Sequence, residues 1–118
     1  MTEVHHLDEG IPTAQNKDGG KPALGLLPWV GLVEVGRVME FGARKYAKHN
    51  WAQAGGMDWT RQLSSCLRHI AAWAMGESVD TESGLPHLAH AVTRLLYLLY
   101  YERYGIGTDD RLKGAGHV

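Results

Sequence analysis

Carboxylate and imidazole side chains gather in one short stretch of this sequence. Glu77 and Asp80 are spaced E-x-x-D and are followed by His87 and His90, so that two carboxylates and two imidazoles fall within fourteen residues. Oxygen and nitrogen donors of this kind suit Mg²⁺, Mn²⁺ or Co²⁺, and the imidazoles favour the transition metals over Mg²⁺. The E-x-x-D spacing alone is common by chance, but its position beside the two histidines predicts a divalent metal site with these four residues as ligands.

A further carboxylate, Glu34, interrupts an apolar helical face. On a helix Glu34 lies in line with Val30, Val38 and Phe41, whereas Glu40 lies on a mostly charged face. Burying an unpaired charge costs several kcal/mol, so Glu34 needs a partner. We interpret Glu34 as a metal ligand and catalytic residue, and an ion pair with another helix is the alternative.

The polar stripe of the third predicted helix has an unusual composition. It contains His87, His90, Arg94, Tyr97 and Tyr101, whereas exposed faces are usually rich in lysine, glutamate and glutamine. The opposite stripe consists of Leu88, Val92, Leu95 and Leu99. The polar stripe either faces a functional site or forms an ordinary packing interface, and the sequence leaves both interpretations open.

Other motifs limit the possible chemistry. The chain has no P-loop, no G-x-G-x-x-G and no serine in a nucleophile-elbow pattern, and Cys66 lacks a setting that would activate its thiol. Lys21, in the glycine-rich stretch KDGGKP, is placed either to hold a phosphate or on a flexible arm. His69 borders the apolar stripe of the second helix, where a histidine is more often a hydrogen-bonded core residue. Metal-assisted hydrolysis is therefore the leading enzyme class.

Three helices must position these residues. The periodicity predicts helices from Pro28 to about Tyr46, from Trp59 to Met75 and from Pro86 to about Tyr104. Proline is well placed in a first turn, Asp58 can cap the second helix and Gly76 can end it. No alternating pattern requires a sheet, so the predicted fold is all-α.

The helical segment has polar flanks. We expect an extended arm over residues 1–22, a helical catalytic domain over residues 23–105 and a loose tail over residues 106–118. The third helix is apolar or aromatic almost all round, and a chain this short can bury it fully only against another subunit. The sequence therefore predicts a compact helical bundle completed in a homodimer or homotetramer.

Composition excludes several function classes. The chain has 118 residues, enough for one domain, and a net charge of −1, which offers no basic field for a nucleic acid. Arg94 interrupts the longest apolar run, so no membrane span is expected. Cys66 is the only cysteine and the first residues do not resemble a secretory signal, which predicts a cytoplasmic protein.

Four stretches together resemble a known family. They are KDGGKPALGLLP, EVGRVMEFGARKYAKHNW, CLRHIAAWAMGESVD and SGLPHLAHA. In combination, over about residues 16–102, they resemble the phage-encoded dATP/dGTP diphosphohydrolases, which are related to the all-α, MazG-like nucleotide pyrophosphohydrolases. The wider MazG-like group uses E-E-x-x-E and E-x-x-D on two helices. This chain has one clear E-x-x-D, in a predicted loop, and Val33 replaces the glutamate that often precedes Glu34.

The resemblance implies metal-dependent hydrolysis of a purine deoxynucleoside triphosphate to monophosphate and pyrophosphate. In phages whose DNA contains 2-aminoadenine, such an enzyme removes dATP and supplies dGMP for the modified base, in the host cell cytoplasm. The residues that match the family motifs are Glu34, Lys45, Asn50, Trp51, His69, Asp80, His87 and His90.

These matches assign roles by resemblance and side-chain chemistry. Glu34 and His69 are the candidate catalytic residues. The substrate-binding candidates are Lys21, Lys45, Asn50, Trp51 and Arg94, with the cations on the phosphates, the asparagine on the purine edge and the tryptophan stacked on the base. Two alternatives remain open: a non-catalytic helical assembly module, and a pyrophosphohydrolase for another nucleotide or phosphoanhydride.

Overall fold

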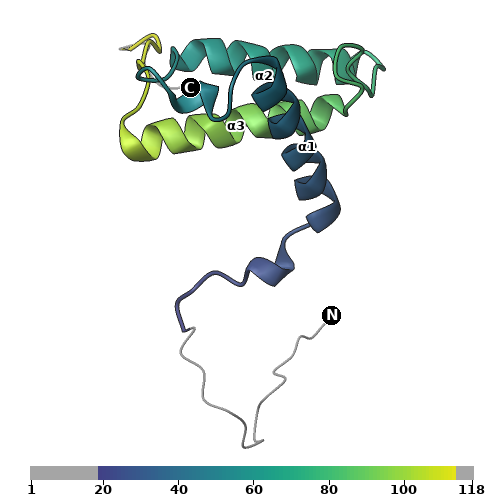
Figure 1. The fold of residues 1–118 in the computed structure, drawn as a ribbon, viewed down its shortest axis with the longest axis horizontal. Coiled ribbons are helices and arrows are strands. Elements are labelled where there is room, and N and C mark those ends of the chain that lie inside the picture. Colours follow the sequence, from purple (N-terminus) through teal and green to yellow (C-terminus); the bar gives the residue numbers. More distant parts are fainter. Residues whose placement is uncertain (1–18, 114–118) are drawn as a thin grey trace, which may run out of the picture.

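The computed structural model describes residues 19–113, and helices form its framework (Figure 1). The elements are, in chain order, η1 Leu24–Leu26, α1 Trp29–Lys45, η2 Asn50–Ala52, α2 Trp59–Ala74 and α3 His87–Tyr104, where η denotes a short 3-10 turn. Within this range the only β-type pairings are isolated bridges. The all-α prediction is confirmed, and the three helices end within a few residues of their predicted limits.

The helix ends follow local chemistry with one exception. Pro28 is the N-cap of α1, and Gly105 ends α3 in the left-handed conformation at φ 65°. Asp58 occupies the N-cap position of α2, but its side chain makes no capping hydrogen bond. Instead, the Thr60 amide donates to Asp110 Oδ1 at 2.9 Å, so a carboxylate from the end of the chain caps this helix.

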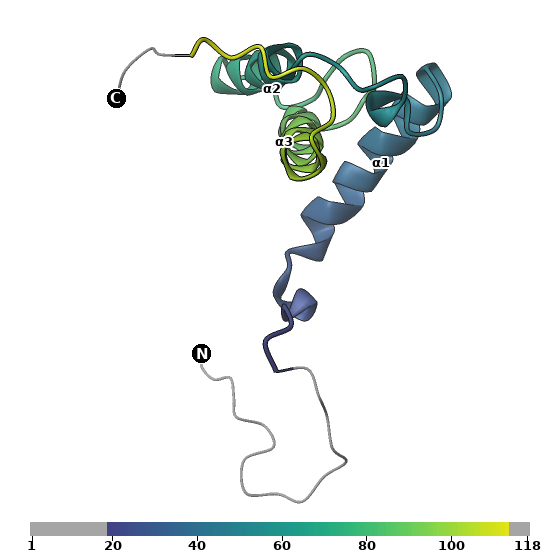
Figure 2. The same ribbon diagram turned by 90° about the vertical axis from the view of Figure 1, so that its left-hand side faces the viewer.

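α2 and α3 form an antiparallel pair, and α1 crosses it. The start of α2 pairs with the segment after α3, because Asp58 bridges Thr108, and residues 75–86 connect the other ends. From Val35 onward α1 packs on α3, and Val35 and Val38 are buried there with Ala89. The first half of α1 projects away from the pair (Figure 2). The loops after α1 and α2 therefore meet beside α3.

Part of the chain after α3 is held in place, in contrast to the predicted loose tail. Within residues 106–113, the Gly107 amide donates to the Gly55 carbonyl at 2.7 Å, and the Trp59 indole donates to the Ile106 carbonyl at 2.8 Å. Only glycine fits at position 107, because an added Cβ would lie 2.3 Å from a backbone oxygen. The rest of the predicted tail, residues 114–118, and residues 1–18 of the predicted arm lie outside the described residues.

α2 and α3 bury polar side chains between them and leave leucine-rich stripes exposed. The residues of α3 that the fold buries are His87, Ala89, His90, Ala91, Thr93, Tyr97 and Tyr101. The leucine-rich stripe of α3, in contrast, is 40% exposed at Val92 and 63% exposed at Leu99. On α2 the buried residues are Gln62 and Cys66, while Leu67 is 51% exposed. None of the helices within residues 19–113 has the length and apolar character that crossing a membrane requires.

Candidate active site

A large cavity lies where the loops after α1 and α2 meet α3. It has a volume of about 670 Å³, which is large enough for a nucleotide. Its wall includes the end of α1, the loop that contains η2, one face of α2 and the polar stripe of α3. The predicted site residues that line it are Lys45, Asn50, Trp51, His69, Asp80, His90 and Arg94. The fold thus brings together side chains that are up to 49 residues apart in the sequence, from Lys45 to Arg94.

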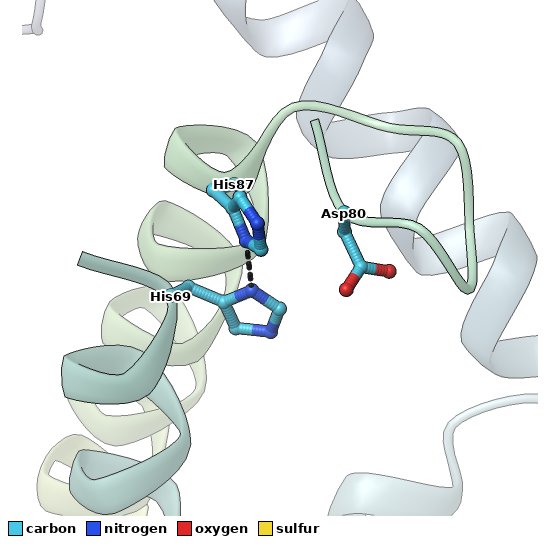
Figure 3. A group of neighbouring side chains, drawn as sticks. All are labelled: His69, Asp80 and His87. Atoms are coloured by element: carbon cyan, nitrogen blue, oxygen red, sulfur yellow. Dashed lines mark hydrogen bonds between the residues drawn. The ribbon is translucent and has the colours of Figure 1, made fainter. Parts of the chain in front are cut away.

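A group that could bind a metal ion lies at one end of this cavity. His69 from α2, Asp80 from the loop after α2 and His87 from α3 each present a ligand atom, and these atoms lie within 4.8 Å of one another. Figure 3 shows the three side chains pointing toward a common space from three different elements. Imidazole nitrogens with a carboxylate oxygen suit Mn²⁺, Co²⁺ and similar ions.

The spacing and protonation of the two imidazoles fit a metal ion. His87 Nε2 lies 2.6 Å from Glu77 Oε1. A carboxylate only accepts, so Nε2 carries a proton, and a ring whose single proton is on Nε2 presents the lone pair of Nδ1. That Nδ1 accepts a hydrogen bond from His69 Nδ1 at 2.9 Å, and a bound metal ion would take the place of the shared proton. Two nitrogens bound about 2.1 Å from one ion in adjacent positions would be about 3 Å apart. Glu77 thus orients His87 from behind, as carboxylates commonly do for metal-binding histidines.

The surroundings of His69 and Asp80 shift their pKa values in directions that favour binding of a cation. Burial, together with the neighbouring His90, lowers the pKa of His69 to about 4, so His69 is neutral at pH 7 and can bind a metal ion without first losing a charge. Burial alone would raise the pKa of Asp80, but hydrogen bonds from the Ser83 amide and hydroxyl lower it overall. The site therefore presents a neutral imidazole and an ionised carboxylate at neutral pH.

His90 lies next to this group. Its ring stacks on His69 with 4.4 Å between centroids and 7° between planes. His90 Nε2 lies 2.7 Å from Ser83 Oγ and 3.7 Å from Asp80 Oδ2. His90 is 7% exposed and its pKa is lowered, chiefly by burial. The predicted ligand His90 thus packs against the metal-binding group, and its role as a ligand stays a prediction.

Cationic side chains line the cavity beside the metal-binding group. Lys45 Nζ lies 2.5 Å from Glu82 Oε2, and this hydrogen bond raises the pKa of Lys45. Arg94 reaches the cavity from α3, and Arg61 and Arg68 reach it from α2. Within residues 19–113, neither Arg61 nor Arg68 makes an ion pair. Such a concentration of positive charge favours a polyanionic ligand.

An aromatic wall lies farther along the cavity. The rings of Trp51 and Tyr97 are stacked, with 4.3 Å between centroids and 12° between planes. Tyr100 meets the Trp51 ring edge-on at 5.0 Å. Asn50 lines the same region and offers an amide that can donate and accept. Aromatic rings and a free amide are the groups expected around a nucleobase.

Four predicted site residues do not line this cavity: His87 of the metal-binding group, its partner Glu77, and also Glu34 and Lys21. Glu34 Oε1 lies 3.5 Å from Arg37 Nε on the same helix, and Glu34 does not line the cavity. Glu40, which the sequence placed on a charged outer face, lines the cavity although it is exposed. Lys21 is exposed on the segment before η1 and does not line the cavity. The predicted roles of Glu34 and Lys21 stay predictions.

Sequence reasoning missed several residues of the cavity. Arg61 and Arg68 are seven residues apart, so they share one face of α2, a spacing that could have indicated an anion-binding face. Glu82 pairs with Lys45, and no local pattern in the sequence marks it. Gln62 is completely buried, and only tertiary contacts identify it.

Fold and cavity together define the class: an all-α protein with a nucleotide-sized cavity in which metal-ligating side chains lie beside cations and aromatic rings. The chain belongs to the family described as dATP/dGTP diphosphohydrolase, N-terminal, whose model matches residues 12–111. It is 33% identical over 94 residues to the dATP/dGTP diphosphohydrolase of Salmonella phage PMBT28. The alignment covers 80% of this chain and 31% of that protein, so the chain spans about a third of its relative's length. No solved structure matches this chain. The resemblance seen in the sequence is confirmed.

Proposed function

We propose that this chain hydrolyses dATP or dGTP to the monophosphate and pyrophosphate in a metal-dependent reaction. One observation carries the proposal: the group formed by His69, Asp80 and His87 lies at the same cavity as the cations and the aromatic wall. A nucleoside triphosphate needs all three features, for its metal, its phosphates and its base. The family membership and the name of the phage relative support the same substrate class.

The phosphate end of the cavity has the groups for hydrolysis of a phosphoanhydride. A divalent ion at His69, Asp80 and His87 would offset phosphate charge and lower the pKa of the attacking water. Arg94 donates two parallel hydrogen bonds to phosphate oxygens, and Lys45 contributes a compact charge when it exchanges Glu82 for phosphate. These cations stabilise the charge that develops on the departing pyrophosphate. Glu34, Glu77 and His90 remain further candidates for metal binding, and Glu34 and His69 for catalysis.

The base end of the cavity supports a purine. Tyr97 and Trp51 present flat apolar surface, and the Asn50 amide can pair with a base edge. In a phage whose DNA contains 2-aminoadenine, this activity removes dATP and supplies dGMP for the modified purine.

Product analysis tests the proposed reaction. The chain is incubated with each of the eight common ribo- and deoxyribonucleoside triphosphates and with Mg²⁺, Mn²⁺ or Co²⁺, and the products are separated by anion exchange. We expect dATP or dGTP to give monophosphate and pyrophosphate in equal amounts. Stepwise release of orthophosphate, or no turnover with any metal, would contradict the proposal.

We also propose that the chain forms a homodimer or homotetramer. The exposed stripe of α3 contains Leu88, Val92, Leu95 and Leu99, and α2 exposes Leu63, Leu67, Ile70 and Trp73 on its surface. Monomeric proteins rarely leave contiguous apolar surface of this kind in water. Light scattering at micromolar concentration is expected to give at least twice the mass of one chain, and a folded monomer would contradict this.

A further inference from the structure

A chain of buried hydrogen bonds connects the two ends of the cavity wall. Gln62 on α2 and Tyr101 on α3 are both 0% exposed. Arg94 Nη1 donates to Gln62 Oε1 at 2.8 Å, and Gln62 Nε2 donates to the Tyr101 hydroxyl at 3.1 Å. The Tyr101 hydroxyl in turn donates to the backbone carbonyl of Trp51. The chain thus runs from a cation in the cavity, through the interior, to the turn η2.

The direction of this chain is fixed by the chemistry at its ends. Arg94 has donors and no acceptor, so the amide oxygen of Gln62 must face it. The amide nitrogen of Gln62 then faces Tyr101, whose hydroxyl oxygen accepts and whose proton points to the Trp51 carbonyl. A carbonyl has no donor, so the arrangement cannot be reversed. Every polar atom on this path has a partner, as burial at 0% exposure demands.

The residues at both ends of this series of hydrogen bonds, Arg94 and Trp51, line the cavity. Arg94 lines it, and its guanidinium carbon lies 5.9 Å from the centre of the Tyr97 ring. At the other end Trp51 stacks on that same Tyr97 ring. Arg94 and the η2 turn are therefore connected in two ways. Hydrogen bonds connect them through Gln62 and Tyr101 in the interior, and ring contacts connect them through Tyr97 at the cavity wall.

We propose that Gln62 is a positioning residue that fixes the Arg94 guanidinium and the η2 turn relative to each other. Its effect on catalysis rests on the proposed function, in which Arg94 binds phosphate and η2 borders the base. Glutamine is suited to this role, because one side chain supplies the acceptor that Arg94 needs and the donor that Tyr101 needs. Leucine would remove both bonds, whereas glutamate would keep the first but has no donor for Tyr101, whose single proton could then serve either the glutamate or the Trp51 carbonyl but not both.

Coupling between substitutions tests this role. Gln62→Leu is expected to raise KM for dATP or dGTP about tenfold to a hundredfold, with a smaller change in kcat, because Arg94 loses its fixed orientation. Arg94→Met alone should raise KM by at least as much. The double variant should be little worse than Arg94→Met, because Gln62 acts through that residue. Arg103→Met, at an exposed arginine of α3 that does not line the cavity, is the control for Arg94→Met and should leave KM unchanged.

Two milder variants keep the test valid if Gln62→Leu fails to fold. Gln62→Glu retains an acceptor for Arg94 and should raise KM less than Gln62→Leu, to the same extent as Tyr101→Phe, which also removes the link to Trp51. Thermal unfolding monitors the fold in each case. A general structural role predicts lower stability with the KM of the folded protein unchanged, and that result would overturn the proposal. Additive effects of Gln62→Leu and Arg94→Met would overturn it as well.

A binding measurement separates this proposal from the proposed function. The same variants are titrated calorimetrically with inorganic triphosphate without metal, and the same non-additive loss of affinity is expected for Gln62→Leu and Arg94→Met. If the variants show this pattern but the wild-type protein hydrolyses no nucleotide, the proposed function fails and the positioning role of Gln62 stands. If the folded wild-type chain binds no triphosphate, Arg94 is not an anion site and the positioning role fails.

Discussion

Asp80→Asn is expected to weaken Mn²⁺ binding at least about a hundredfold and to lower kcat/KM for the nucleotide by a similar factor. Asp80 supplies the only carboxylate among the three clustered ligands, the other two being imidazoles. Metal charge contributes several kcal/mol to such reactions, and about 1.4 kcal/mol is tenfold in rate. Calorimetric Mn²⁺ titration and initial rates measure the two effects.

The substitution changes charge with little change in structure. The Ser83 amide donates to Asp80 Oδ2 at 2.8 Å, and the asparagine carbonyl oxygen can accept the same bond. Asp58→Asn is the matched control, because Asp58 is exposed and its side chain makes no capping bond. Glu34→Gln in the same titration tests the sequence prediction for that residue, and an unchanged affinity would remove Glu34 from the site. Wild-type Mn²⁺ affinity in Asp80→Asn would refute the proposed metal site.

Glu77→Gln is expected to lower metal affinity about tenfold to a hundredfold, the usual effect of losing the carboxylate behind a metal-binding histidine. Glu77 Oε1 lies 2.6 Å from His87 Nε2 and fixes the proton on that nitrogen, so that Nδ1 stays free for the metal. A neutral amide holds this proton less strongly and can rotate to present a donor instead. Metal titration of the folded variant measures the loss.

The size of the effect distinguishes two roles for Glu77. As a direct ligand, which the sequence predicted, Glu77 would be as important as Asp80, and Glu77→Gln would match Asp80→Asn. As an orienting residue, Glu77→Gln should be milder and its effect should vanish in a His87→Ala background. Glu102→Gln, an exposed glutamate near the end of α3, is the control and should leave metal affinity unchanged.

Local sequence signals determined the helices and two of the proposed metal ligands, Asp80 and His87. Apolar periodicity, Pro28, Pro86 and Gly105 define where α1 and α3 begin or end, because capping and backbone preferences act within a few residues. Asp80 and His87 are also close in the sequence, so their proximity in space could be predicted from local structure. Both flank one tight loop, which the Asp80 amide and the Leu85 carbonyl close with a 2.9 Å hydrogen bond. Side chains so close in the sequence meet with little dependence on the rest of the fold.

Contacts between distant segments were not predictable in this way. His69 joins His87 only because α2 and α3 run antiparallel, and Gln62 meets Arg94 and Tyr101 for the same reason. Asp110 caps α2 from 50 residues away, which turned part of an expected loose tail into an ordered segment. Each of these interactions depends on which faces of two helices oppose each other.

Which face of α3 is buried depends on the tertiary structure and was not predictable from the helix alone. Hydrophobicity alone favours burying the leucine stripe of α3, but the chain buries His90, Tyr97 and Tyr101 and leaves Leu99 63% exposed. The polar stripe can be buried because partners on α2 and in the loops satisfy its hydrogen bonds. The sequence thus determined two stripes on one helix. Packing against α2 determined which stripe forms the cavity wall, because only that stripe finds complementary donors and acceptors across the interface.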